Sequence, residues 1–159
     1  SYKPKVTTPI PKNTNAIVCL DVVNLRNQLL KNYLNSEDID VNAFFDIRKL
    51  GFKIPDYLIG FTCGDQSPNT VFTVFEIENT TLTISWLDKL ISAHDFSIST
   101  KNKYTHYINS NQRICVSLNH KKTKLLLSAG VQLKTSEIEK ICNSVFEEIK
   151  ITSFFPEVV

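Results

Sequence analysis

The sequence has 159 residues, of which 42% are hydrophobic and 21% are charged, with a formal net charge of +2. This length suits one domain with a core of its own, and the composition argues against a disordered chain. No apolar run approaches the roughly 18 residues needed to cross a bilayer, and no signal peptide is evident at the N-terminus. We therefore expect a soluble, intracellular protein of the cytoplasm.

Four cysteines are widely separated in the sequence, at Cys19, Cys63, Cys115 and Cys142. Each lies in an apolar run, which is typical of a small buried side chain. Structural zinc sites use closely spaced pairs of ligands, and no such pair is present. We expect free thiols, no metal and no cofactor.

Prolines at positions 4, 9 and 11 favour extended backbone, so residues 1–15 are expected to form a Pro/Lys arm. The rest of the chain, 16–159, is expected to form one domain. Its first element is an apolar run at 16–23, interpreted as a buried strand. Leucines at helical spacing follow within 25–34, and a short helix is predicted over 41–50, where Gly51 ends it.

Strands are predicted at 57–63 and 71–77, followed by a turn at Asn79 and a short strand at 82–84. Ser85 followed by Asp88 predicts the start of a helix over 86–93. Further strands are predicted over 96–99, 104–108, 113–118 and 123–128. Ser136 and Glu139 have the spacing of a capping box for an amphipathic C-terminal helix.

This order of elements predicts an α+β fold. We expect a mainly antiparallel sheet, backed on one face by helices and closing with the C-terminal helix.

Charge is unevenly distributed along the chain. Residues 37–95 carry ten acidic and four basic side chains, whereas residues 96–136 carry seven basic side chains and no acidic one. Basic side chains neutralise phosphates, and aromatic rings stack on bases. The preferred hypothesis is a non-enzymatic interaction domain that binds nucleic acid through this basic sheet surface. The candidate phosphate contacts are Lys101, Lys103, Arg113, Lys121, Lys122 and Lys124, with Tyr104 or Tyr107 as the stacking residue.

A second hypothesis makes the chain a subunit of a larger assembly, such as a viral complex. In that case the acidic 37–95 surface of one copy meets the basic 96–136 surface of the next. No catalytic residue is expected, because the three histidines have no carboxylate or nucleophile near them within the basic segment.

Two resemblances suggest further alternatives. The stretch Cys19–Leu25 resembles the strand-end Asp-x-x-Asn of PIN- and NYN-type ribonucleases, and Gly64-Asp65 is similar to their second acidic turn. The resemblance implies a metal-dependent ribonuclease with Asp21 and Asp65 as Mg²⁺ or Mn²⁺ ligands and Asn24 as an orienting group. The expected third acidic motif is missing.

The strand at 124–130 and the helix at 136–149 are similar to the closing strand and helix of the repeat unit in TATA-box-binding proteins. This similarity covers roughly the last thirty-five residues. The chain shows one unit where that family has two, and it lacks the family's glycine pattern, so the similarity implies a topology and no binding residues.

Overall fold

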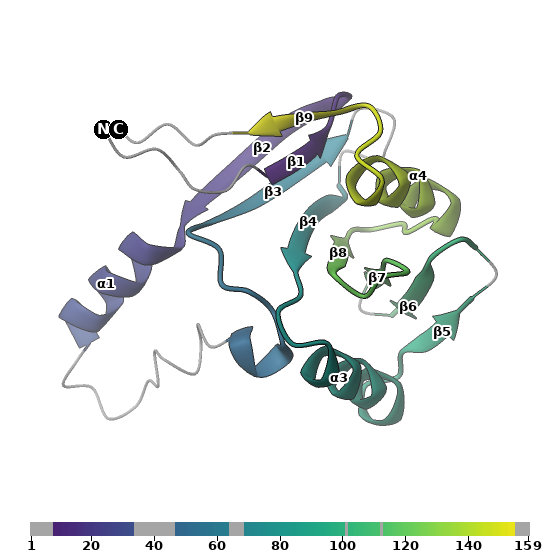
Figure 1. Cartoon of the computed structure of the whole chain (residues 1–159), viewed down its shortest axis with the longest axis horizontal. Helices are drawn as coiled ribbons and strands as arrows, with labels where there is room; N and C mark the ends of the chain where they lie inside the picture. The colour runs from purple at the N-terminus through teal and green to yellow at the C-terminus, as the bar shows by residue number, and fades with distance from the viewer. Residues whose placement is uncertain (1–7, 34–46, 64–68, 101, 112, 155–159) are drawn as a thin grey trace.

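The computed structural model describes residues 8–33, 47–63, 69–100, 102–111 and 113–154. Its strands and helices follow one another along the chain as shown in Figure 1. In chain order they are β1 (Thr8–Pro11), β2 (Thr14–Asp21), α1 (Val22–Tyr33), the 3₁₀ turn η1 (Ile47–Leu50), β3 (Tyr57–Cys63), β4 (Val71–Glu76), α3 (Thr80–Ala93), β5 (Ser97–Ser99), β6 (Thr105–Asn109), β7 (Ile114–Leu118), β8 (Lys124–Ala129), α4 (Thr135–Phe146) and β9 (Ile151–Phe154).

The main sheet has seven strands in the order β2-β3-β4-β8-β7-β6-β5, and every neighbouring pair is antiparallel. The predicted α+β fold, with its antiparallel sheet and C-terminal helix, is confirmed. The last described element is β9, which follows α4 and pairs with β1 in a separate two-stranded sheet.

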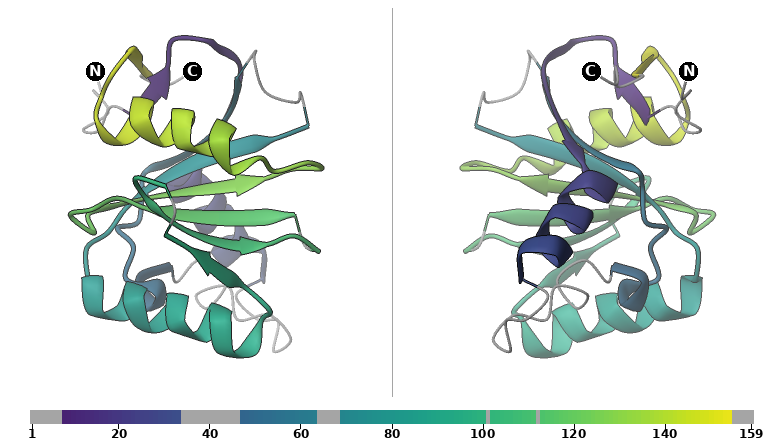
Figure 2. Two further views of the ribbon diagram at one scale, coloured as in Figure 1. Left: turned by 90° about the vertical axis from the view of Figure 1, so that its right-hand side faces the viewer. Right: turned by 90° about the vertical axis from the view of Figure 1, so that its left-hand side faces the viewer.

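Helices cover both faces of the main sheet, whereas the sequence suggested helices on one face. Figure 2 shows α4 and α3 on opposite sides of the strands. Alternation along each strand explains the two layers, because successive side chains point to opposite faces. Cys115 packs in the core cluster that includes the buried residues of α4, here called the α4 cluster. Its neighbour Val116 packs in the cluster that includes the buried residues of α3, here called the α3 cluster. Leu126 and Leu125 divide between the two clusters in the same way.

Helix α3 begins six residues before the expected position, at Thr80 rather than Trp86. Its N-cap is Asn79, whose side-chain oxygen accepts a hydrogen bond from the backbone N–H of Leu82 at 3.1 Å. Asparagine is among the best N-cap residues because it satisfies one of the unpaired amides of the first turn. The predicted strand at 82–84 is therefore wrong, and that segment forms the first turns of the helix.

Part of the predicted N-terminal arm belongs to the folded core. The described part of the arm includes β1, which pairs with β9, and the side chains of Ile10 and Pro11 are buried. Ile10 contributes to the same core cluster as α4. The core therefore begins before residue 16 and joins the two ends of the described chain.

Candidate functional site

Two lysines of the basic segment have acidic partners at the C-terminal end of α4. Lys103 donates a hydrogen bond to the carboxylate of Glu147, and Lys124 forms an ion pair with Glu148 at 3.6 Å. The hydrogen bond from Lys103 is the main cause of a lowered pKa at Glu147. The basic charge that the sequence concentrates in 96–136 is thus partly neutralised within the fold.

The two candidate stacking residues are buried. Tyr104 is 2% exposed, and its hydroxyl donates a hydrogen bond to the side-chain oxygen of Asn143 at 3.0 Å. Burial raises the pKa of Tyr104 well above its usual value. Tyr107 is 6% exposed and packs in the α3 cluster on the other face of the sheet. Neither ring offers an open face to a nucleic-acid base in this structure.

Arg113 lies apart from the other described candidate cations. Arg113 precedes β7, whereas Lys121 and Lys122 lie in the turn that follows it, so they are at opposite ends of one strand. All three are exposed. Lys101 falls outside the described residues. Of the predicted contacts, the fold places Lys103, Lys121, Lys122 and Lys124 at the same end of the sheet.

A polar network that the sequence did not suggest lies beneath α4. His106 Nδ1 is 2.7 Å from the hydroxyl of Ser117, its cross-strand neighbour. His106 Nε2 is 2.6 Å from a carboxylate oxygen of Glu139 on α4. The expectation that the histidines have no nucleophile near them within 96–136 is therefore wrong for Ser117, whereas that segment contains no carboxylate. The carboxylate is that of Glu139, outside the basic segment. The sequence feature that could have indicated the His106–Ser117 contact is the alternation of side chains along the strands, which puts both residues on one face of the sheet.

This Ser–His–Glu arrangement is closed to substrates. Both Ser117 and His106 are 0% exposed, and a nucleophile has to reach its substrate to act. Two thiols lie beside Ser117, and burial raises the pKa of Cys115 to about 11 and raises that of Cys142 further. Both thiols are therefore protonated and unreactive near neutral pH. The network has the properties of an internal attachment between helix and sheet.

The residues that resemble a ribonuclease site have a structural role at the end of β2. Asp21 Oδ1 accepts a hydrogen bond from the backbone N–H of Asn24 at 2.8 Å, which caps the start of α1. Asp65 is outside the described residues. Within the described chain no group of three His, Cys, Asp or Glu side chains could hold a metal ion. The sheet is antiparallel, which differs from the parallel core of those nucleases.

Strand β2 exposes apolar side chains to solvent. It forms one edge of the main sheet, and six of its eight residues, Asn15 to Leu20, are exposed. Val18 is 70% exposed, Leu20 41% and Ile17 36%, so apolar side chains of both faces contact solvent. The sequence correctly predicted a strand here but wrongly predicted that it is buried.

Comparisons with family models, with curated proteins and with solved structures found no match. In the described part of the chain, no helix combines the length and the apolar character needed to span a membrane.

Proposed function

We propose that this chain is a non-enzymatic interaction domain that associates with a second copy of itself through β2. The observation that supports this proposal is an edge strand with apolar side chains exposed on both faces. An edge strand presents a row of N–H and C=O groups that can pair with another strand. No described strand pairs with the outer edge of β2.

Apart from an irregularity in its pairing with β3 between Thr14 and Ala16, the edge lacks the charges and prolines that usually prevent such pairing. Proteins block exposed edges with lysine, proline or inward-pointing charges. Between Thr14 and Leu20 the strand TNAIVCL has no charged residue and no proline. The acidic Asp21 lies at its end.

A second copy fits this edge without charge repulsion. In an antiparallel arrangement with the two-fold axis at Val18, Ile17 lies opposite Cys19 of the other copy, and Ala16 lies opposite Leu20. Asp21 then faces Asn15 rather than another aspartate. Such pairing extends the antiparallel sheet across both copies and covers part of the apolar surface.

The test is size-exclusion chromatography with light scattering over a wide range of protein concentration. The wild-type chain is expected to form dimers that dissociate on dilution. Val18→Lys places a charge in the middle of the edge and is expected to give monomers. Val131→Lys is the matched control, because Val131 is also exposed, at 49%, but lies in the loop before α4. It is expected to leave dimerisation unchanged.

Monomers at every concentration, or dimers that persist in a folded Val18→Lys variant, would contradict the proposal. Nucleic-acid binding is examined on the same samples by fluorescence anisotropy with labelled single-stranded RNA and DNA. Salt-sensitive binding that is lost when Lys121 and Lys122 become Glu would instead favour the nucleic-acid hypothesis.

A further inference from the structure

The main sheet contains a gap between β3 and β4. These strands are paired only at Gly60 with Thr73 and at Phe61 with Phe72. The next connection between this part of the chain and β4 is the hydrogen bond from the Lys53 N–H to the Glu76 carbonyl at 2.9 Å. The chain takes seven residue steps from Lys53 to Gly60 and only three from Glu76 to Thr73. The extra residues bulge away from β4.

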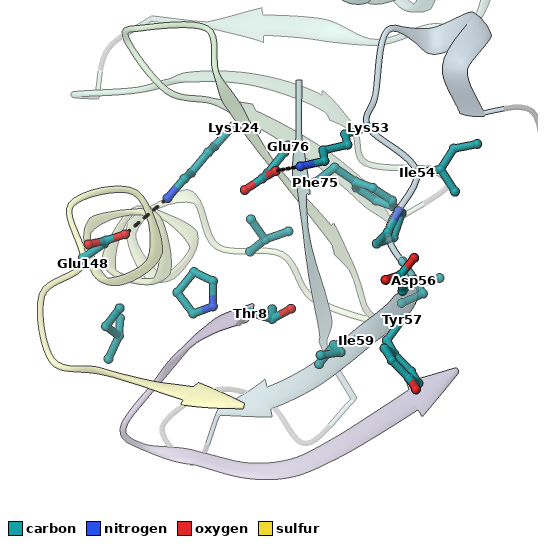
Figure 3. A pocket seen from close by; sticks show the side chains of 15 residues that line it. Thr8, Lys53, Ile54, Asp56, Tyr57, Ile59, Phe75, Glu76, Lys124 and Glu148 are labelled. Carbon is teal, nitrogen blue, oxygen red and sulfur yellow. Dashed lines mark ion pairs between the residues drawn. The ribbon is translucent and has the colours of Figure 1, made fainter. Parts of the chain in front are cut away.

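A groove of about 740 Å³ occupies this gap, as Figure 3 shows. One side is the diverging pair of strands, and the other is formed by Thr8 and Pro9 of β1 and Ile151 of β9. A groove of this volume is in the range of small-ligand sites.

Backbone groups of both strands point into the gap. In an antiparallel strand the N–H and C=O of alternate residues point to the same side. The Glu76 carbonyl accepts a hydrogen bond from Lys53 on the β3 side, whereas the N–H of Ile77 bonds to Thr123 on the β8 side. Val74 is two residues before Glu76, so its backbone groups also point to the β3 side and into the gap. The Asp56 carbonyl bonds to Val22 on the β2 side, so Tyr57 and Ile59 present theirs to the gap.

Continued pairing would have placed Ile59 opposite Val74 and Tyr57 opposite Glu76, and neither pair is formed. The groove therefore has backbone donors and acceptors on both sides, in the positions that a strand between them would use. Backbone polar groups favour hydrogen-bonded partners over apolar ones. An alkyl chain would leave these groups unpaired, whereas an extended peptide would pair with both sides.

The ends and the rim of the groove limit the occupant further. Backbone hydrogen bonds close the gap at both ends, so a long strand cannot pass through it in the plane of the sheet. The three steps along β4 leave room for about three extended residues. The rim carries the Lys53–Glu76 pair at 3.5 Å and the Lys124–Glu148 pair at 3.6 Å, together with Asp56.

These rim residues supply two cations and three carboxylates, which disfavours a phosphate-rich ligand. They complement a ligand that carries one positive and one negative end. We propose that the groove between β3 and β4 binds a short extended peptide of about three residues with free termini. The peptide backbone pairs with Ile59 and Val74, and its charged ends lie at the rim.

The probe is the tripeptide Ala-Leu-Ala with free termini, titrated into the ¹⁵N-labelled full chain and followed by NMR. Saturable shifts are expected for the amides of Tyr57, Ile59 and Val74. The same peptide with acetylated and amidated ends is expected to bind at least about threefold more weakly, because it lacks the two charges.

Thr8 projects into the groove in Figure 3, so Thr8→Trp is expected to fill it and weaken binding by at least about tenfold. Thr152→Trp is the control, because Thr152 is exposed on the neighbouring strand β9 and does not line the groove. The proposal is overturned if no saturable shift appears up to about 10 mM peptide. It is also overturned if Thr8→Trp binds as the wild type does, or if the capped peptide binds equally well.

Discussion

The imidazole of His106 and the carboxylate of Glu139 are 2.6 Å apart and join α4 to β6, the strand next to the β5 edge of the main sheet. The second oxygen of Glu139, Oε1, is buried and has no hydrogen-bond partner among the residues that the structure describes. A buried polar pair adds little stability compared with apolar side chains of the same volume, but it makes each partner dependent on the other. Its effect is therefore to fix where α4 sits on the sheet.

Glu139→Ala is expected to lower the free energy of unfolding by about 3 kcal/mol, because it removes the partner of the buried Nε2 of His106, while Nδ1 keeps its contact with Ser117. Replacement of both His106 and Glu139 by Leu is expected to recover most of that loss. Urea unfolding measures both effects. Lys140→Ala, an exposed position on the same helix, is the control and should change stability by less than about 0.5 kcal/mol. A double variant that loses as much stability as Glu139→Ala, or more, would contradict the expected recovery.

The same residue shows where sequence patterns stop being informative. Of the predicted apolar stripe Ile138, Ile141, Cys142, Val145 and Ile149, the first four form the buried face of α4, whereas Ile149 lies beyond the end of the helix and is 50% exposed. The capping box was wrong, because the N-cap is Lys134, with no side-chain cap hydrogen bond, and Glu139 turns to His106 instead. A local pattern cannot reveal a competing partner that is 33 residues away in the chain.

The buried thiol of Cys115 predicts a loss of stability at alkaline pH. Burial raises its pKa from 9.0 to about 11 in the folded protein. Between these values the unfolded thiol has lost its proton and the folded thiol retains it, so stability decreases as pH rises. Cys115→Ala should reduce that decrease between pH 9 and pH 11 by about 2 kcal/mol. Urea unfolding across this pH range measures the slope, and an unchanged slope in the variant would refute the assignment.

Burial of β2 was the clearest error of the sequence interpretation. The run Ala16–Val23 has the composition of a core strand, but six of the eight residues of β2 are exposed, and α1 begins at Val22. An apolar composition indicates that a strand needs an apolar environment. It does not report whether that environment comes from the same chain, which is why the candidate interface appears only once the sheet order is known.

Gly51 is expected to tolerate no side chain. The sequence correctly placed a stop at this position, where the backbone has φ +83° directly after η1. An added Cβ would lie 2.2 Å from the Asn79 carbonyl oxygen, next to the start of α3. Gly51→Ala should therefore cost about 2 kcal/mol or more in thermal or urea unfolding. Gly60→Ala is the control, because its Cβ would be 3.3 Å from a methyl group of Val71, and it should cost clearly less.

Cys19 is expected to be the thiol that reacts first with Ellman's reagent, because it is exposed on β2 whereas Cys63, Cys115 and Cys142 are buried. Its pKa is raised, first by partial burial and second by Asp21, so its reaction should accelerate as pH rises. Asp21→Asn should increase the rate at neutral pH by lowering that pKa. If β2 pairs with a second copy, the rate should also fall as protein concentration increases. In Val18→Lys this concentration dependence should disappear, and a wild-type rate that is independent of concentration would count against pairing through β2.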